Sequence, residues 1–117
     1  MKAEQLTQLV VEALDDMKAQ NVHVIDVRDK TSVTDVMIIS SGTSARQVKS
    51  QAERVVEKSK ESGVMPIGVE GEKEAEWVLV DLGDVVVHIM QPTIRDFYHL
   101  EKLWATDEAG VDSSTNQ

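Results

Sequence analysis

The sequence has no cysteine among its 117 residues. Disulfides, thiolate metal sites and cysteine nucleophiles are therefore excluded together, and the composition fits a reducing compartment. Aromatic residues make up only 3% of the chain, and there are only two prolines. The core must therefore be built mainly from aliphatic side chains, and the branched ones among them favour β-strands.

Long apolar runs and basic residues are also scarce. No run is long enough to span a membrane, and the N-terminal segment MKAEQLTQLVVEALDDMK is charged throughout, unlike a signal peptide. We therefore expect a cytoplasmic protein with no membrane partner. The 12 basic residues stand against 21 acidic ones, which gives a formal net charge of −9. This charge disfavours direct nucleic-acid contact and favours a basic protein partner, although it could serve solubility alone.

The spacing of apolar residues predicts an α/β domain with a small mixed sheet and helices packed on it. The expected elements, in chain order, are a helix over 2–19 closed by Asn21, strands over 22–27 and 35–40, a helix over 44–63, an edge strand within 64–69, a hairpin over 77–90 and a helix over 92–104. We expect residues 1–105 to form one domain and residues 106–117 to be a disordered acidic tail.

The segment WVLVDLGDVVVHIM predicts a β-hairpin with Leu82 and Gly83 at the centre of its turn. This register pairs Asp81 with Asp84 and Trp77 with His88. One face then carries only aliphatic side chains, those of Val78, Val80, Val85, Val87 and Ile89. The other face carries Trp77, Leu79, Asp81, Asp84, Val86, His88 and Met90.

The second face mixes apolar, imidazole and carboxylate groups, which is typical of a surface that meets a partner. We therefore predict a recognition face marked by Trp77 and His88. Two alternatives remain open. Another helix could cover this face, which would make Trp77 a core residue and His88 a satisfied buried imidazole. A three-residue turn with a glycine bulge would shift the pairing by one residue.

Few patterns point to catalysis or metal binding. The turn from Ser41 to Gln47 could expose N–H groups to a phosphate. It lacks the glycine patterns of known phosphate loops, and a capping box between Ser44 and Gln47 explains its hydroxyls, so the structural role is favoured. Asp81 and Asp84 could be a general acid and base, but polar residues are expected beside a turn. The three histidines lack the spacing of metal ligands, so we expect no metal and no cofactor.

Four stretches in this order resemble the ribosomal silencing factor family, also called RsfS or Iojap-related proteins: SGTSARQV, VEGE, WVLVDLGDVVVHIM and RDFYHLEKLW. The resemblance covers nearly the whole chain except the acidic tail. It implies a fold similar to that of nucleotidyltransferases, without enzymatic activity. It also implies binding to the large ribosomal subunit through its protein number fourteen. Such binding blocks association with the small subunit and silences translation when nutrients are scarce.

The matching motifs supply the candidate site. The partner-binding candidates taken from them are Trp77, Leu79, Asp81, Asp84, His88, Met90, Arg95, Tyr98 and Glu101, with Trp104 in the same motif as a candidate for partner or core contact. The chain departs from the family pattern at Val36 and Met37, which follow Asp35 where many relatives have an aromatic residue. We interpret this difference as a change in packing.

Two further hypotheses accompany this function. One is a nucleotide-binding or nucleotidyltransferase-like enzyme that uses the turn from Ser41 to Gln47. Against it, that fold needs paired carboxylates close after a glycine-serine turn, and this chain has no acidic residue from there until Glu53. The other is a weak homodimer, in which two copies cover the same apolar patch symmetrically.

Overall fold

The computed structural model describes residues 1–98 of the chain. Its elements are α1 (Ala3–Asp16), β1 (Gln20–Asp26), β2 (Val36–Ser41), α2 (Ala45–Glu61), β3 (Gly68–Glu70), β4 (Trp77–Asp81), β5 (Val85–Met90) and α3 (Pro92–Tyr98). The strands form one sheet in the order β1-β2-β5-β4-β3. Neighbouring strands are antiparallel except β2 and β5, which are parallel. The predicted α/β class with a mixed sheet is confirmed, whereas the likeness to nucleotidyltransferases stays a prediction.

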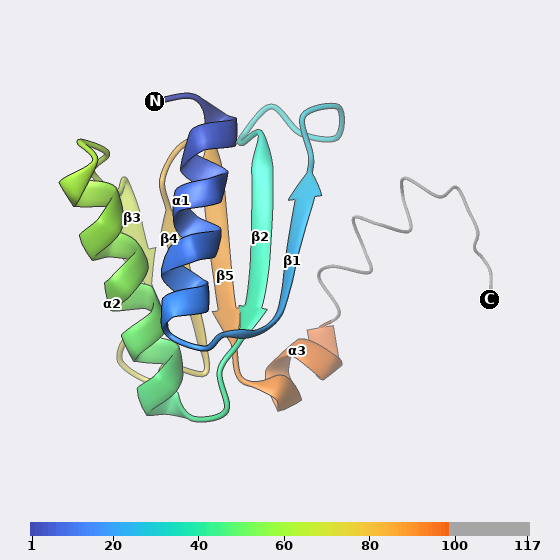
Figure 1. Cartoon of the computed structure of the whole chain (residues 1–117). Helices are drawn as coiled ribbons and strands as arrows, with labels where there is room; N and C mark the ends of the chain where they lie inside the picture. Colours follow the sequence, from blue (N-terminus) through green and yellow to red (C-terminus); the bar gives the residue numbers. More distant parts are fainter. Residues whose placement is uncertain (99–117) are drawn as a thin grey trace.

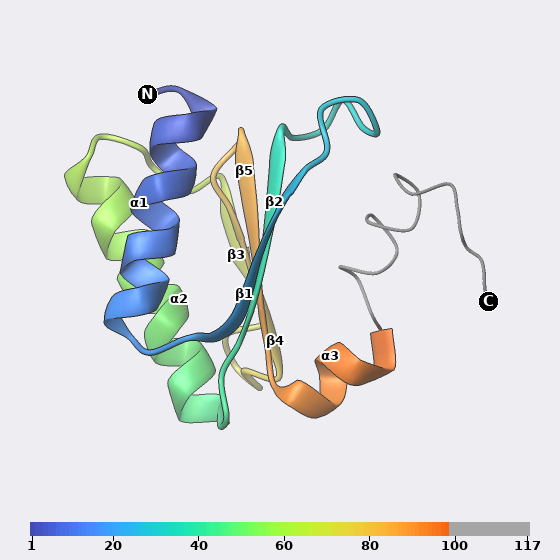
Figure 2. The ribbon, with the colours of Figure 1, turned by 45° about the vertical axis from the view of Figure 1, so that its right-hand side comes forward.

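The helices lie on both sides of the sheet. Helices α1 and α2 cover one face, and α3 lies on the other side near the end of β5 (Figure 1, Figure 2). We call the face under α1 and α2 the helical face. Within the described residues, no helix is long and apolar enough to cross a membrane.

The main core lies between the helical face and the two helices. The buried residues at its centre include Leu6, Val10 and Leu14 of α1, Val48 and Val55 of α2, and Ile38, Val78, Val80, Val87 and Ile89 of the sheet. Strands β2 and β5 are buried along their whole length because they occupy the middle of the sheet. This position explains why both are nearly continuous apolar runs.

The connection from α1 to β1 differs from the prediction. Helix α1 ends at Asp16, and Lys18 takes the left-handed conformation that closes it, with φ of 59°. Asn21 is also left-handed, with φ of 51°, but it lies inside β1, where the register with β2 shifts between Gln20 and His23. Asn21 therefore serves a β-bulge and does not close the helix.

The hairpin register is also a correction. Trp77 pairs with Met90 instead of His88, and Asp81 pairs with Val86 instead of Asp84. The backbone N–H of Leu82 donates to the carbonyl of Val85 across 2.9 Å, so Gly83 and Asp84 form the centre of the turn. Each pairing moves by two residues, which is one full period of side-chain alternation. The predicted composition of each face is therefore retained within the strands although the pairs change, whereas Asp84 lies in the turn and not on the second face.

Candidate partner-binding site

The predicted recognition face occupies the side of the hairpin that faces away from α1 and α2. We call this surface the mixed face, and its members are Trp77, Leu79 and Asp81 of β4 and Val86, His88 and Met90 of β5. The three residues of β4 are half-buried, whereas the three of β5 are buried. The β4 half is thus the part of this surface that a partner can reach most directly.

Trp77 and His88 form one hydrogen-bonded pair. The indole Nε1–H of Trp77 donates to Nδ1 of His88 across 2.9 Å, and the ring centroids lie 5.8 Å apart. The two residues are diagonal neighbours, because His88 lies opposite Leu79. Since Nδ1 accepts this bond, the histidine carries its own hydrogen on Nε2. The alternative of a satisfied buried imidazole is therefore what the structure shows for His88.

Burial sets the charge of this pair. His88 is only 7% exposed, and burial lowers its pKa from the ordinary 6.5 to about 4. The imidazole is therefore neutral at pH 7, which agrees with its role as hydrogen-bond acceptor. Its effect on the surface is positional, because it holds the indole of Trp77 in one orientation.

A small apolar cluster lies next to this pair. Its buried members are Val27, Met37, Ile39 and Met90, with Ile25, Trp77 and Ile94 packed against them. Met90 has no exposed surface. This site candidate therefore packs under the mixed face, in the cluster that Trp77 contacts. Met37 belongs to the same cluster and Val36 to the main core, which agrees with the interpretation that the departure at these two positions is one of packing.

Helix α3 joins this cluster to the end of β2. Arg95 is 5% exposed, and its Nη1 donates to the hydroxyl of Ser41 across 2.7 Å. This site candidate is thus a buried connecting residue in the described structure. Tyr98 is the last described residue of α3, and Glu101 and Trp104 lie outside the described residues. Their roles stay predictions, as do the partner contacts of all the candidates.

The turn after β2 uses its polar groups internally. Ser44 Oγ accepts from the N–H of Gln47 at 3.1 Å, as the capping-box pattern predicts. The return bond differs: Gln47 Oε1 accepts from the N–H of Thr43 at 2.7 Å rather than from that of Ser44. These bonds give the hydroxyl-rich turn a structural role, and the alternative of a bound phosphate stays a prediction.

A buried glutamine in α2 completes this junction. The amide of Gln51 accepts from the hydroxyl of Ser40 and donates to the carbonyl of Ser41, each across 3.2 Å. Gln51 was not among the residues predicted from the sequence. Its position three residues after Val48, on the apolar face of the helix, is the signal that could have found it.

The two aspartates of the hairpin support its turn. Asp81 Oδ1 accepts from the N–H of Gly83 at 2.9 Å. The main-chain carbonyl of Asp84 accepts from the N–H groups of Asp35 and Val36, and its side chain is exposed. No cluster of three or more His, Cys, Asp or Glu in the described part of the chain could hold a metal ion. Asp81 therefore stabilises the turn through its side chain, whereas Asp84 contributes its main-chain carbonyl.

Similar proteins identify the family. The family model described as "Ribosomal silencing factor during starvation" matches residues 1–117. The Ribosomal silencing factor RsfS of Haemophilus influenzae is 46% identical over 100 residues, which are 86% of this chain and 98% of that protein. A mouse (Mus musculus) protein named "Mitochondrial assembly of ribosomal large subunit protein 1" is 33% identical over 99 residues, covering 82% of this chain and 43% of its own.

The fold agrees with these sequence matches. The crystal structure of a Chromobacterium violaceum protein aligns with a TM-score of 0.88 at 43% identity, covering 98% of this chain and 92% of the other. The family model and the solved structure each cover nearly the whole chain, and the chain belongs to the ribosomal silencing factor family.

Proposed function

We propose that this protein is a non-enzymatic repressor of translation that acts in the cytoplasm. It binds the large ribosomal subunit through its protein number fourteen and sterically blocks association with the small subunit under nutrient limitation. The observation that carries this proposal is the family match over residues 1–117. The mouse relative is itself named for assembly of the ribosomal large subunit, which supports that subunit as the partner.

The mixed face has the composition that such a partner requires. Trp77 and Leu79 are half-buried and offer apolar surface, and Asp81 lies on the same strand. Asp84 adds an exposed carboxylate at the turn. Interfaces commonly combine an aromatic anchor with a polar rim, and acidic rim residues favour a basic protein. The net charge of −9 acts in the same direction.

The bond between Trp77 and His88 gives the indole a fixed place in this surface. A ring that is already oriented loses less conformational entropy when a partner binds. Replacement of Trp77 by alanine should therefore cost about 2 kcal/mol or more of binding free energy. That variant also leaves Nδ1 of His88 without its donor, so a second variant that spares the pair is needed.

Sedimentation of purified ribosomal subunits tests the proposal. The protein should comigrate with the large subunit and not with the small one. It should also reduce the formation of joined particles when both subunits are mixed. Absence of comigration with either subunit would overturn the ribosomal function. Comigration without loss of joining would retain ribosome binding and remove the steric block.

A matched pair of leucine variants locates the contact. Leu79 on the mixed face and Leu9 on α1 are both half-buried, on opposite sides of the sheet. Leu79→Ala should lower the affinity for the large subunit about tenfold, whereas Leu9→Ala should retain it. Equal affinity of the two variants would place the contact elsewhere.

The same surface supports the expected weak homodimer. Two copies that cover their mixed faces symmetrically would bury the β4 half of each. Light scattering should then show a dimer at high concentration that Leu79→Ala weakens. A monomer throughout the concentration range would refute this association without affecting the ribosomal proposal.

A further inference from the structure

The β3 edge of the sheet has a free side that the mixed face does not use. Because β3 is the last strand in the sheet, its side away from β4 has no neighbour among the described strands. Strand backbones direct N–H and C=O groups to both sides, so this edge can pair with an added strand. A Cβ atom placed on Gly68 would meet no heavy atom within 4 Å. No side chain of the described residues therefore packs over the sheet at this position of β3.

A groove runs between this edge and α2. Its lining combines two valines with four charged residues, namely Val56, Val69, Glu53, Glu57, Lys60 and Glu72. Both valines are half-buried and pack against the main core. An apolar side chain that enters the groove would therefore extend the core outward.

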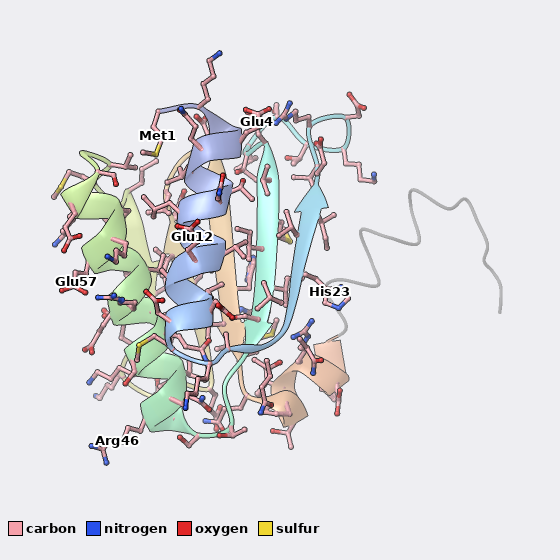
Figure 3. The ribbon with its side chains drawn as sticks, in the orientation of Figure 1. Met1, Glu4, Glu12, His23, Arg46 and Glu57 are labelled. Carbon is pink, nitrogen blue, oxygen red and sulfur yellow. The ribbon has the colours of Figure 1, made fainter. Side chains whose placement is uncertain are left out.

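The charge of the groove is predominantly acidic. Three carboxylates line it with a single ammonium group. Glu57, on the flank of α2 away from α1 (Figure 3), already pairs with Arg54 at 2.8 Å. Glu53 and Glu72 are exposed. These two carboxylates are the ones that a basic ligand would meet.

Exposed apolar side chains continue this surface along the chain before β3. Met65 is 65% exposed and Ile67 is 73% exposed. Exposed apolar residues next to an unpaired strand edge form a surface suited to a partner. The segment that leads into β3 thus adds apolar contact area to the free edge.

We propose that this edge binds an extended basic segment of a partner protein, which adds to the sheet as a strand next to β3. Main-chain hydrogen bonds supply affinity in this mode of recognition, and alternate side chains supply specificity. Apolar side chains of the segment enter the groove between Val56 and Val69, and its lysine or arginine side chains lie near Glu53 and Glu72.

Charge decides between the possible occupants. A second copy of the chain carries the same net charge of −9, and residues 106–117 contain acidic but no basic residues. The carboxylates of the groove repel both. This surface is separate from the mixed face, so the inference does not depend on the ribosomal proposal.

An alternating lysine-valine heptapeptide with blocked ends is the probe that tests this edge. Titrated into the full-length protein, it should shift backbone amide NMR signals of Gly68–Glu70 and Val56. A glutamate-valine peptide should not bind. A lysine-valine peptide methylated on all of its backbone nitrogens should lose binding, because it cannot donate hydrogen bonds to the edge. Equal binding of the methylated peptide would show charge attraction only and would overturn strand addition.

Two double variants with the same change in net charge locate the site. The double variant Glu53→Lys with Glu72→Lys should lower the affinity for the lysine-valine peptide about tenfold. Glu12→Lys with Asp15→Lys alters exposed residues of α1 instead, and it should change affinity only slightly. Equal weakening by both pairs, shifts centred on another element, or no shifts at all would each overturn the proposal.

Discussion

The two faces of the hairpin differ in what they contribute to the protein. Val78, Val80, Val87 and Ile89 on the helical face have no exposed surface and belong to the main core. The mixed face, formed by the alternate residues of the same strands, holds a hydrogen-bonded aromatic pair and half-buried side chains. The helical face of each strand thus belongs to the main core, while the mixed face combines a smaller apolar cluster with side chains that remain partly exposed. Substitutions on each face and changes of pH test this division.

The largest effect is expected from truncation on the helical face. Ile89→Ala removes a fully buried side chain and should lower the free energy of unfolding by about 3 kcal/mol, because it leaves a cavity in a packed core. Leu79→Ala on the half-buried part of the mixed face should cost about 1 kcal/mol. Urea denaturation measures both. Equal costs would show that the two faces are packed alike.

The pH dependence of stability tests the buried imidazole. Because the pKa of His88 is lowered to about 4 in the folded protein, the unfolded chain binds this proton first as pH falls below about 6.5. Folding stability should therefore fall between pH 6.5 and 4, with a loss of about 2 kcal/mol by pH 5.

His88→Gln is the matched control for that measurement. Its side-chain oxygen can accept the bond from Trp77, but it does not titrate. The difference between the two proteins isolates His88 from the carboxylates that also titrate in acid. If both lose stability in parallel between pH 7 and pH 5, His88 is not held neutral by burial.

The bond within the aromatic pair can be separated from its packing. Trp77→Phe removes the Nε1–H donor and leaves Nδ1 of His88 unsatisfied, which should cost about 1 to 2 kcal/mol of stability. A double-mutant cycle with His88→Leu should give a coupling of about 1 kcal/mol. Additive effects would mean that the two residues stabilise the fold independently.

The smallest effect on stability is expected at the turn. Asp84→Asn should change the free energy of unfolding by less than about 0.5 kcal/mol, because the side chain is exposed and asparagine also suits turns. If the mixed face meets a basic partner, the same change should weaken binding to the large subunit about threefold at low salt. Glu74→Gln, in the exposed loop before β4, is the control that should bind normally.

Local patterns predicted the elements and the faces better than the pairings. Alternation along β4 and β5 gave the correct composition of each face because it depends only on neighbours in sequence. The same patterns did not determine the hairpin register. Gly83 has φ of 89°, and a glycine with positive φ suits both the predicted and the observed turn. The bonds from Asp35 and Val36 to the carbonyl of Asp84 help to hold the observed turn, and they come from a distant part of the chain.

The site itself was only partly predictable. The sequence placed Trp77 and His88 on the same face, but their bond depends on a diagonal arrangement that the predicted register did not contain. The bond from Arg95 to Ser41 joins residues 54 positions apart, so no local sequence pattern predicts it. Burial of His88, Met90 and Arg95 likewise follows from tertiary packing, which a list of motif residues does not convey.

The parallel pairing of β2 with β5 has a consequence for biosynthesis. Residues 42–84 lie between these two strands, which form the middle of the sheet. As the chain leaves the ribosome from its N-terminus, β2 has only β1 as a partner until β5 has been made. The closure of this long connection should slow folding, because its entropy is lost before the central contacts form. A chain that stops before Val85 would keep an apolar strand with an open edge, which is a site for aggregation.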